Sequence, residues 1–292
     1  MSIPMNVACY LCHLRRNTEI ARDLAGEEAA TAFARDLMEL YVQAPKEKGS
    51  PWFGPGVTQL LEKHCGLQGD RYKEEKEESN RFVLERMDII RDRIRSAADP
   101  LYAGLQMAVL GNYIDFSALR GEVSFEKLDE MLLQAQNIEL DRNTYAQLQA
   151  ELEKGGNLLY LTDNAGEIGF DRLFAEEIHR KYPQMQITFC VRGGPASNDA
   201  TREDAREVGI AFPVIDNGTT IAGTEPETLT GAAKLAFETA DVILSKGQAN
   251  VETLYGCGKN IYYIFLIKCQ RFVEYFQKEK LTPMLLREKK EG

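Results

Sequence analysis

Hydrophobic residues in the first half of the chain recur at helical spacing. Val83, Met87, Ile90 and Ile94 are separated by four, three and four residues, which places them in one stripe along a helix. Charged residues fill the positions between them, as in a helix with one face in a core and the other in water. We therefore predict that the chain is helical up to about residue 155.

The pattern changes after Gly155. Short continuous apolar runs now alternate with helical patterns, and the runs occupy residues 157–162, 186–191, 212–215, 241–244 and 260–267. Short buried strands that alternate with helices indicate a parallel sheet with helices on its faces. We predict a helical N-terminal subdomain at residues 1–155 and an α/β core at residues 156–292, with a frayed helix from Gln277 onward.

Composition narrows the classes of function. The 292 residues are 44% hydrophobic and 27% charged, which is typical of a soluble globular enzyme. Acidic residues (45) outnumber basic residues (35), and a formal charge of −10 argues against a nucleic-acid partner. A small phosphorylated metabolite stays compatible with this charge, because a bound cation can supply the positive charge locally.

The chain also lacks membrane and export signals. No apolar run reaches membrane-spanning length, and the first residues lack the basic region and apolar core of a secretory signal. We expect a cytoplasmic protein with no membrane partner, and the sequence leaves the oligomeric state open.

Four polar loops follow the predicted strands. They cover residues 163–167, 192–199, 216–218 and 245–250. In an open parallel sheet these loops leave the carboxyl edge, where such folds bind ligands. The four loops together therefore predict a ligand site at this edge.

The side chains of these loops suit a metal ion and a phosphate group. Asp163, Asn164, Asp199 and Asp216 offer carboxylate and amide oxygens, which hard cations such as Mg²⁺ and Mn²⁺ prefer. Lys246 adds a positive charge, and the helices predicted after the first and fourth loops direct free N–H groups at an anion. Each loop alone is equally typical of a turn or a helix cap, so only their coincidence at one edge favours a site.

Cys9 and Cys12 form a Cys-x-x-Cys pair near the start of the chain. One turn apart on a helix, the two thiols can bind a metal or form a labile disulfide. A structural zinc site normally needs four ligands, however, and few further donors lie nearby in the sequence. A structural role is the simpler interpretation, and the sequence leaves the role of the pair open.

Several spaced motifs resemble those of the metal-dependent damage-control phosphatases, a family long catalogued as a domain of unknown function. These motifs are residues 163–167 (DNAGE), 198–201 (NDAT), 203–205 (EDA), 246–250 (KGQAN), 70–73 (DRYK), 99–101 (DPL) and 111–115 (GNYID). The resemblance covers nearly the whole chain to about Cys269. The Cys-x-x-Cys pair is similar to the pattern of the stand-alone prokaryotic branch.

The resemblance implies a fold, a metal site and a reaction. The implied fold is a Rossmann-like three-layer α/β core with a parallel sheet and a helical N-terminal part. The implied metal ligands are Asp163, Asn164 and Asp199, and Mg²⁺, Mn²⁺, Co²⁺ or Ni²⁺ is expected to support hydrolysis of phosphate monoesters of sugars or damaged metabolites. Asp163, Asp199 and Lys246 are then the catalytic residues. The residues expected to bind substrate are Gly166, Glu167, Asn112, Asp115, Lys246 and Asn250.

Three positions depart from the family pattern. Arg71 stands where proline is usual, Ala249 where glycine is frequent, and Gln270 where proline is common. None of them is a proposed metal ligand, so the departures bear on the choice of substrate.

Two mechanisms and two other functions remain open from sequence alone. In one mechanism a metal-bound water attacks phosphorus, and in the other an aspartate forms an aspartyl-phosphate. A carboxylate methyltransferase that uses S-adenosylmethionine is one alternative function, although residues 163–169 have too few glycines for a convincing nucleotide fingerprint. A non-catalytic metal-binding module is the other.

Overall fold

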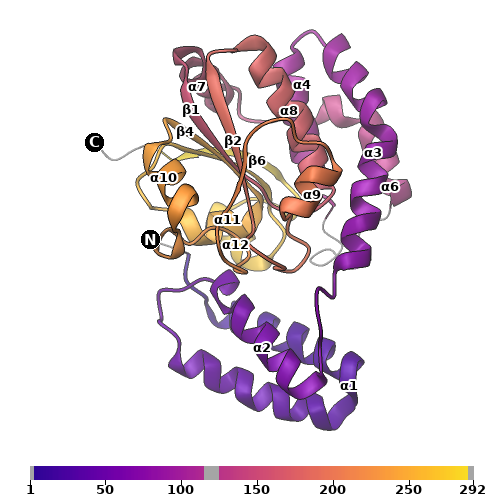
Figure 1. Cartoon of the computed structure of the whole chain (residues 1–292), viewed down its shortest axis with the longest axis vertical. Helices are drawn as coiled ribbons and strands as arrows, with labels where there is room; N and C mark the ends of the chain where they lie inside the picture. Colours follow the sequence, from indigo (N-terminus) through magenta and orange to yellow (C-terminus); the bar gives the residue numbers. More distant parts are fainter. Residues whose placement is uncertain (1–2, 115–124, 289–292) are drawn as a thin grey trace.

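The protein is described here by a computed structural model, which covers residues 3–114 and 125–288 (Figure 1). The helices of the first half are α1 (Val7–Gln43), α2 (Gly54–Cys65), α3 (Lys73–Ser96), α4 (Pro100–Gly111), α6 (Phe125–Leu133) and α7 (Arg142–Lys154). The second half contains β1 (Gly156–Leu161), α8 (Glu167–Lys181), β2 (Met185–Val191), α9 (Arg202–Glu207), β3 (Val214–Asp216), α10 (Gly231–Thr239), β4 (Val242–Lys246), α11 (Gly247–Leu254), β5 (Ile261–Leu266), α12 (Gln270–Phe276) and β6 (Pro283–Glu288). No helix within the described ranges is both long and apolar enough to cross a bilayer.

The strands form one six-stranded sheet in the order β3-β2-β1-β4-β5-β6. The first five strands are parallel, and helical crossover connections lead from each of β1 to β4 to the next strand. β6 runs antiparallel to β5, with Leu285 opposite Ile264. This arrangement confirms the predicted mostly parallel Rossmann-like sheet.

The frayed helix predicted from Gln277 onward is wrong, because residues 283–288 form the edge strand β6. Leu285 packs into the core on one face of the sheet, whereas Met284 and Leu286 contact the core on the other face. This alternation has the period of a strand. It is short and is followed by charged residues, so the charged tail obscured it in the sequence.

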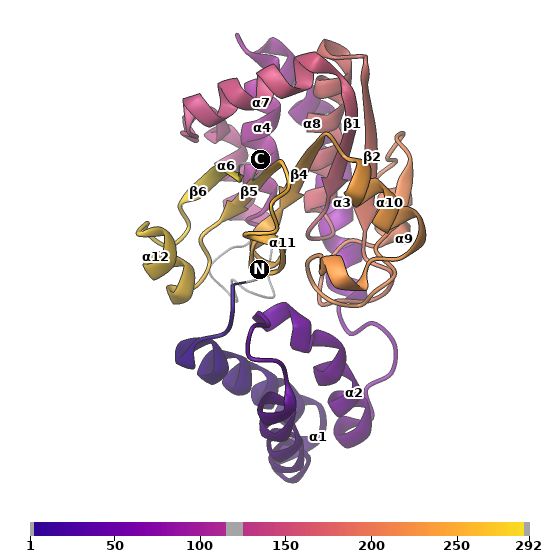
Figure 2. The same ribbon diagram turned by 90° about the vertical axis from the view of Figure 1, so that its left-hand side faces the viewer.

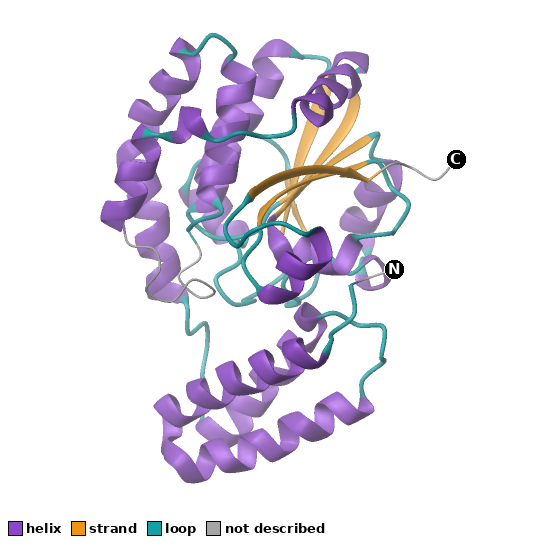
Figure 3. Cartoon of the chain, turned by 180° about the vertical axis from the view of Figure 1, so that it is seen from behind, coloured by secondary structure: helices purple, strands orange, loops and turns teal. Residues whose placement is uncertain are grey.

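Helices cover both faces of the sheet and complete three layers (Figures 1 and 3). On one face, Leu158 and Tyr160 of β1 pack in a core shared with α4, α7 and α8, where Phe174 is fully buried. On the other face, Leu159 and Leu161 pack in a core shared with α10, α11 and α12. Burying one such side chain contributes about 1.5–3 kcal/mol, so the alternating faces of β1 hold both helical layers onto the sheet.

The helices of the first half divide into two groups. α1 and α2 pack around their own core, which includes Phe33 and Leu37, and they lie beyond one edge of the α/β core (Figure 2). We call residues 7–65 the helical cap. α3, α4 and α7 instead pack with the sheet or with α8, so they belong to the hydrophobic core of the second half. The change in sequence pattern at Gly155 thus marks the start of β1, while the hydrophobic core continues across it.

Candidate active site

The site forms where the order of the strands reverses. β1 and β4 are neighbours, and their connections leave in opposite directions, to β2 on one side and to β5 on the other. Open α/β sheets bind ligands in the crevice at such a point. The loop after β1 carries Asp163 and Asn164, and β4 runs directly into α11 at Gly247.

Backbone hydrogen bonds join the loop after β1 to the loop after β2. The Ala200 N–H donates to the Asp163 carbonyl at 2.7 Å, and the Ala165 N–H donates to the Asn198 carbonyl at 2.9 Å. Asn164 and Asp199 also form an isolated antiparallel bridge. Three residues expected from the sequence to hold a metal therefore come together, although 35 positions separate Asn164 from Asp199 (199 − 164).

Amide groups fix the carboxylate of Asp163. Its Oδ2 accepts hydrogen bonds from Asn112 Nδ2 at 3.0 Å and from Asn164 Nδ2 at 2.8 Å. Asn164 Nδ2 also donates to Glu167 Oε2 at 2.8 Å. Because the nitrogen of the Asn164 amide is turned toward these carboxylates, its Oδ1 is turned away from them. These hydrogen bonds thus fix the positions of both side chains at the carboxyl edge of the sheet.

Arg192 holds the carboxylate of Asp199. Its Nε donates to Asp199 Oδ2 at 2.6 Å, and its Nη2 donates to the Thr162 carbonyl at 3.0 Å. The guanidinium is fully buried, and a buried charge requires a partner of this kind. The sequence analysis did not assign a role to Arg192. The available signal was an arginine placed directly after a buried strand.

Lys246 lies in a buried ion network behind these carboxylates. Its Nζ donates to Glu167 Oε1, to Asp171 Oδ1 at 2.7 Å and to the Ala108 carbonyl at 2.8 Å. Burial opposes the charged form of Lys246, but the carboxylates of Asp171 and Glu167 outweigh it and raise the lysine's pKa. Burial raises the pKa of Asp171 to about 7, with the charge of Lys246 acting in the other direction. The network keeps the lysine charged inside the protein.

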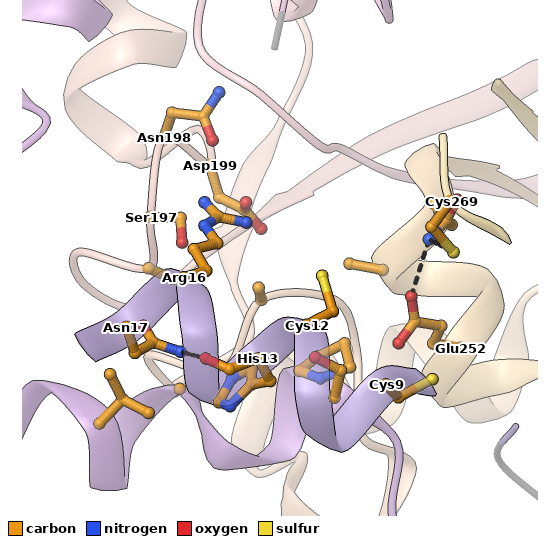
Figure 4. A pocket seen from close by; sticks show the side chains of 18 of the residues that line it. Cys9, Cys12, His13, Arg16, Asn17, Ser197, Asn198, Asp199, Glu252 and Cys269 are labelled. Carbon is orange, nitrogen blue, oxygen red and sulfur yellow. Dashed lines mark hydrogen bonds between the residues drawn. The ribbon is translucent and has the colours of Figure 1, made fainter. Parts of the chain in front are cut away.

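A cavity of about 870 Å³ lies against the carboxyl edge of the sheet and the helical cap. Its lining includes Asp163, Asn164 and Asp199, and Figure 4 shows side chains of α1 facing Asp199 across it. This volume is within the range of pockets that bind small metabolites.

The other predicted site residues lie behind the cavity wall or away from it. Asn112, Glu167, Lys246 and Asn250 are fully buried and are absent from the described cavity lining, so a direct substrate contact by Lys246 is not supported by its position. The reason is that Asp171 and Glu167, one helical turn apart on α8, draw the ammonium group inward.

Three further predicted residues have different surroundings. Gly166 donates its N–H to Asn80 Oδ1 at 2.7 Å, and Asp115 lies outside the described residues. Asp216 pairs with Arg202 at 2.6 Å and takes no part in the described lining.

Comparison with known proteins identifies the family. The model of the damage-control phosphatase ARMT1-like domain matches residues 5–282. The chain belongs to this damage-control phosphatase family.

Several relatives share most of the chain. An uncharacterized protein of Methanocaldococcus jannaschii is 33% identical over 287 residues, which cover 94% of this chain and 92% of that protein. Proteins named damage-control phosphatase from Archaeoglobus fulgidus and Pyrococcus horikoshii are each 33% identical, over 205 and 201 residues, covering 69% and 68% of this chain and 70% and 67% of their own lengths. The crystal structure of a family protein from P. horikoshii matches with a TM-score of 0.82 and 26% identity, covering 98% of this chain and 99% of that chain.

Another part of the cavity wall carries thiols and the carboxyl group of Glu252. Cys9 and Cys12 of α1 and Cys269 after β5 line it together with Glu252 of α11 (Figure 4). The six cysteines are unpaired, and burial raises the pKa of the Cys9 and Cys269 thiols. In residues 3–114 and 125–288 no group of three or more His, Cys, Asp or Glu residues has the geometry of a metal site. Cys9 and Cys269 therefore line the wall of the cavity as neutral thiols.

Glu252 holds its proton up to neutral pH. Its Oε1 accepts a hydrogen bond from Gln248 Nε2 at 3.0 Å. Burial raises its pKa from 4.5 to about 7, while the Gln248 amide and the Arg271 charge act against this shift. Between these two pKa values the folded protein keeps a proton that the unfolded chain has released. The contribution to stability is therefore complete below about pH 4.5 and is lost as the pH rises through about 7.

We expect Glu252→Gln to flatten this part of the pH dependence. The fall in the free energy of unfolding between about pH 5 and about pH 8 should shrink by about 1–2 kcal/mol, because the amide does not ionise. Urea denaturation at a series of pH values measures the effect. The control Glu274→Gln alters an exposed carboxylate on α12 and should keep the parent slope. An unchanged slope in Glu252→Gln would show that this carboxyl is not the group responsible.

Proposed function

We propose that the protein is a divalent-metal-dependent phosphatase that hydrolyses phosphate monoesters of sugars or damaged small metabolites. The observation that supports it is the convergence of Asp163, Asn164 and Asp199 on the wall of a metabolite-sized cavity at the reversal point of the sheet. The names of two relatives agree with a phosphatase.

The donor set fits a hard divalent cation. The three residues supply carboxylate and amide oxygens, which suit Mg²⁺ or Mn²⁺, with Co²⁺ or Ni²⁺ as further candidates. When bound, the cation supplies positive charge beside the phosphoryl group and lowers the pKa of a bound water.

The chain's own residues keep this donor set in place. Asn112 and Arg192 hold Asp163 and Asp199 from behind, and such supporting hydrogen bonds orient metal ligands. Asn250 donates to the carbonyls of Thr162 and Lys246, at 3.0 and 2.7 Å, and so ties the end of β1 to the end of β4. We assign Lys246 the role of balancing the charges of Glu167 and Asp171 in the buried network behind Asp163.

α11 offers backbone donors to the substrate. The helix starts at Gly247, and its residues Gln248 and Ala249 line the cavity. The first N–H groups of a helix lack partners within the helix and attract anions. A phosphoryl group at the carboxylates would receive hydrogen bonds from this end of α11.

Hydrolysis of a substrate panel tests the proposal. Metal-free protein is incubated with p-nitrophenyl phosphate and a set of sugar phosphates, first without added metal and then with each of the four cations. We expect phosphate release only when a cation is added. Folded, metal-loaded protein that releases no phosphate would contradict the proposal, and binding of S-adenosylmethionine without metal would favour the methyltransferase instead.

The backbone at Gly247 makes a sharper prediction about Asp163. A Cβ atom at residue 247 would lie 1.9 Å from Asp163 Oδ2, and φ is +78° there. We expect Gly247→Ala to displace the carboxylate and to weaken Mn²⁺ binding by about 10- to 100-fold, the usual cost of disturbing the support of a metal ligand. Isothermal titration calorimetry measures this affinity.

Gly231→Ala is the matched control for this variant. Gly231 is also the first residue of a helix with a positive φ, +52°, but nothing lies within 4 Å of its added Cβ. It therefore carries the backbone strain without the collision and should retain the parent's Mn²⁺ affinity. Equal affinity in both variants would show that Asp163 does not hold the metal.

A further inference from the structure

The helical cap supplies one wall of the cavity. His13, Arg16 and Asn17 of α1 line it opposite the loop after β2. In Figure 4 the guanidinium of Arg16 reaches across the cavity toward Ser197 and Asp199. A cationic side chain of the cap therefore faces one of the proposed metal ligands.

Arg16 has no hydrogen-bond or ion-pair partner among residues 3–114 and 125–288. Among the residues that the structure describes, none accepts a hydrogen bond from its guanidinium or pairs with it within 4 Å. Its neighbour Arg15 instead donates to Glu19 at 3.0 Å, and Arg22 donates to Glu27 at 2.6 Å. Arg16 is half-buried and lines the cavity, so donors of its guanidinium can reach a ligand there.

Hydrogen bonds fix the neighbours of Arg16 on α1. Asn17 Nδ2 donates to the His13 carbonyl at 2.8 Å, and the His13 Nδ1 atom lies 2.6 Å from the Tyr41 hydroxyl. Burial lowers the pKa of His13 to about 4, and the positive charge of Arg16 adds to this. His13 is therefore neutral at physiological pH, so Arg16 is the charged residue among His13, Arg16 and Asn17.

The charge balance of the site requires a cation of this kind. Two aspartates and a divalent cation sum to zero, whereas a phosphate monoester carries nearly two negative charges at neutral pH. Behind these groups, the positive charges of Lys246 and Arg192 equal in number the negative charges of Glu167 and Asp171. The buried groups and the divalent cation thus sum to zero, so the substrate's charge is to be met by cationic residues of the cavity wall, among them Arg16.

We propose that Arg16 is a substrate-binding residue, which the helical cap contributes to the site, and that its guanidinium binds two oxygens of the substrate's phosphoryl group. This inference rests on the proposed function and extends it to recognition. Arginine presents paired N–H groups that match phosphate oxygens, and a bidentate contact favours a dianionic monoester over a diester. Substrate selection then depends on the cap as well as on the α/β core.

Equilibrium dialysis with radiolabelled inorganic phosphate tests the inference on Mg²⁺-loaded protein. We expect Arg16→Gln to weaken phosphate binding by about 10- to 100-fold, in line with the loss of charge-assisted hydrogen bonds. Arg16→Lys keeps the charge but loses the paired geometry, so it should bind with intermediate affinity. Arg35→Gln removes an equal charge from an exposed position in the second part of α1, beyond the kink at Gly26, and should bind like the parent. With p-nitrophenyl phosphate, Arg16→Gln should raise KM more than it lowers kcat, and its Mg²⁺ affinity should match that of the parent.

The outcomes separate this inference from the proposed function. Phosphate binding by Arg16→Gln that equals the parent's, or a parent that binds no phosphate, would overturn the role of Arg16 whether or not esters are hydrolysed. A parent that binds phosphate through Arg16 but hydrolyses no ester would uphold this role and overturn the phosphatase proposal. If circular dichroism shows that Arg16→Gln is unfolded, Arg16→Lys decides the question, because tight binding by the lysine variant overturns the bidentate contact.

Discussion

Replacing Asp163 with asparagine is expected to lower metal-dependent phosphate release by at least about 10³-fold, because a metal ion supplies several kcal/mol of transition-state stabilisation. The change removes one of two carboxylate charges in the donor set. It also leaves the Asn112 and Asn164 amides facing a neutral group in a buried site. Asp199→Asn should have a similar effect, since it leaves Arg192 as a buried charge without its carboxylate partner. Turnover at saturating cation and direct metal titration measure both variants.

Asp216→Asn is the matched control. Asp216 also follows a strand at the carboxyl edge, but its side chain is 32% exposed and pairs with Arg202, whose side chain is 49% exposed. Such a surface pair contributes little, so turnover should stay within about twofold of the parent rate. If Asp163→Asn retained turnover comparable to this control, the assignment of the metal ligands would be wrong.

Lys246→Met is expected to reduce the free energy of unfolding by about 3–5 kcal/mol, the usual result of removing one partner from a buried ion pair. Glu167 and Asp171 would then lie buried without their cation. The pKa of Asp171 in the folded protein should rise, because Lys246 no longer lowers it, so the deficit should grow as the pH rises from mildly acidic to mildly basic. Urea denaturation followed by circular dichroism measures the loss.

Two further variants show whether a loss of stability in Lys246→Met comes from the buried charges. Lys234→Met removes a lysine that is 60% exposed and should change stability by no more than about 0.5 kcal/mol. Adding Glu167→Gln and Asp171→Asn to Lys246→Met should restore part of the lost stability, because the buried charges are then gone. A loss below about 1 kcal/mol in Lys246→Met would contradict the buried network, since breaking such a pair is strongly destabilising.

Much of the core fold was predictable because fully buried parallel strands leave continuous apolar runs. The strands at residues 156–161, 185–191 and 261–266 lie within one residue of the predicted runs at their N-terminal ends. β6 was missed because a short edge strand beside charged residues has little apolar periodicity. The sequence also did not predict that α3, α4 and α7 pack against the α/β half. An amphipathic stripe identifies the buried face of a helix but not the element that covers it.

The sequence likewise identified only part of the candidate site. The proximity of Asp163, Asn164 and Asp199 follows from the topology of a parallel sheet, which gathers the loops after its strands at one edge. The position of Lys246 depends on Asp171, which is four residues into a helix pattern and had no distinguishing sequence signal. Arg16 reaches the site from α1, far away in the sequence, and the pairing of Arg192 with Asp199 depends on how the loop after β2 folds, so composition and spacing alone did not identify them.

We propose that one divalent cation on Asp163, Asn164 and Asp199 makes the protein a phosphatase. Titration of Mn²⁺ into metal-free protein, with metal occupancy and p-nitrophenyl phosphate hydrolysis recorded in the same samples, tests this directly. We expect that hydrolysis is absent without metal and rises in proportion to occupancy of a site that Asp163→Asn removes. Hydrolysis that persists in the metal-free protein, or full occupancy without hydrolysis of this ester or of any sugar phosphate, would contradict it.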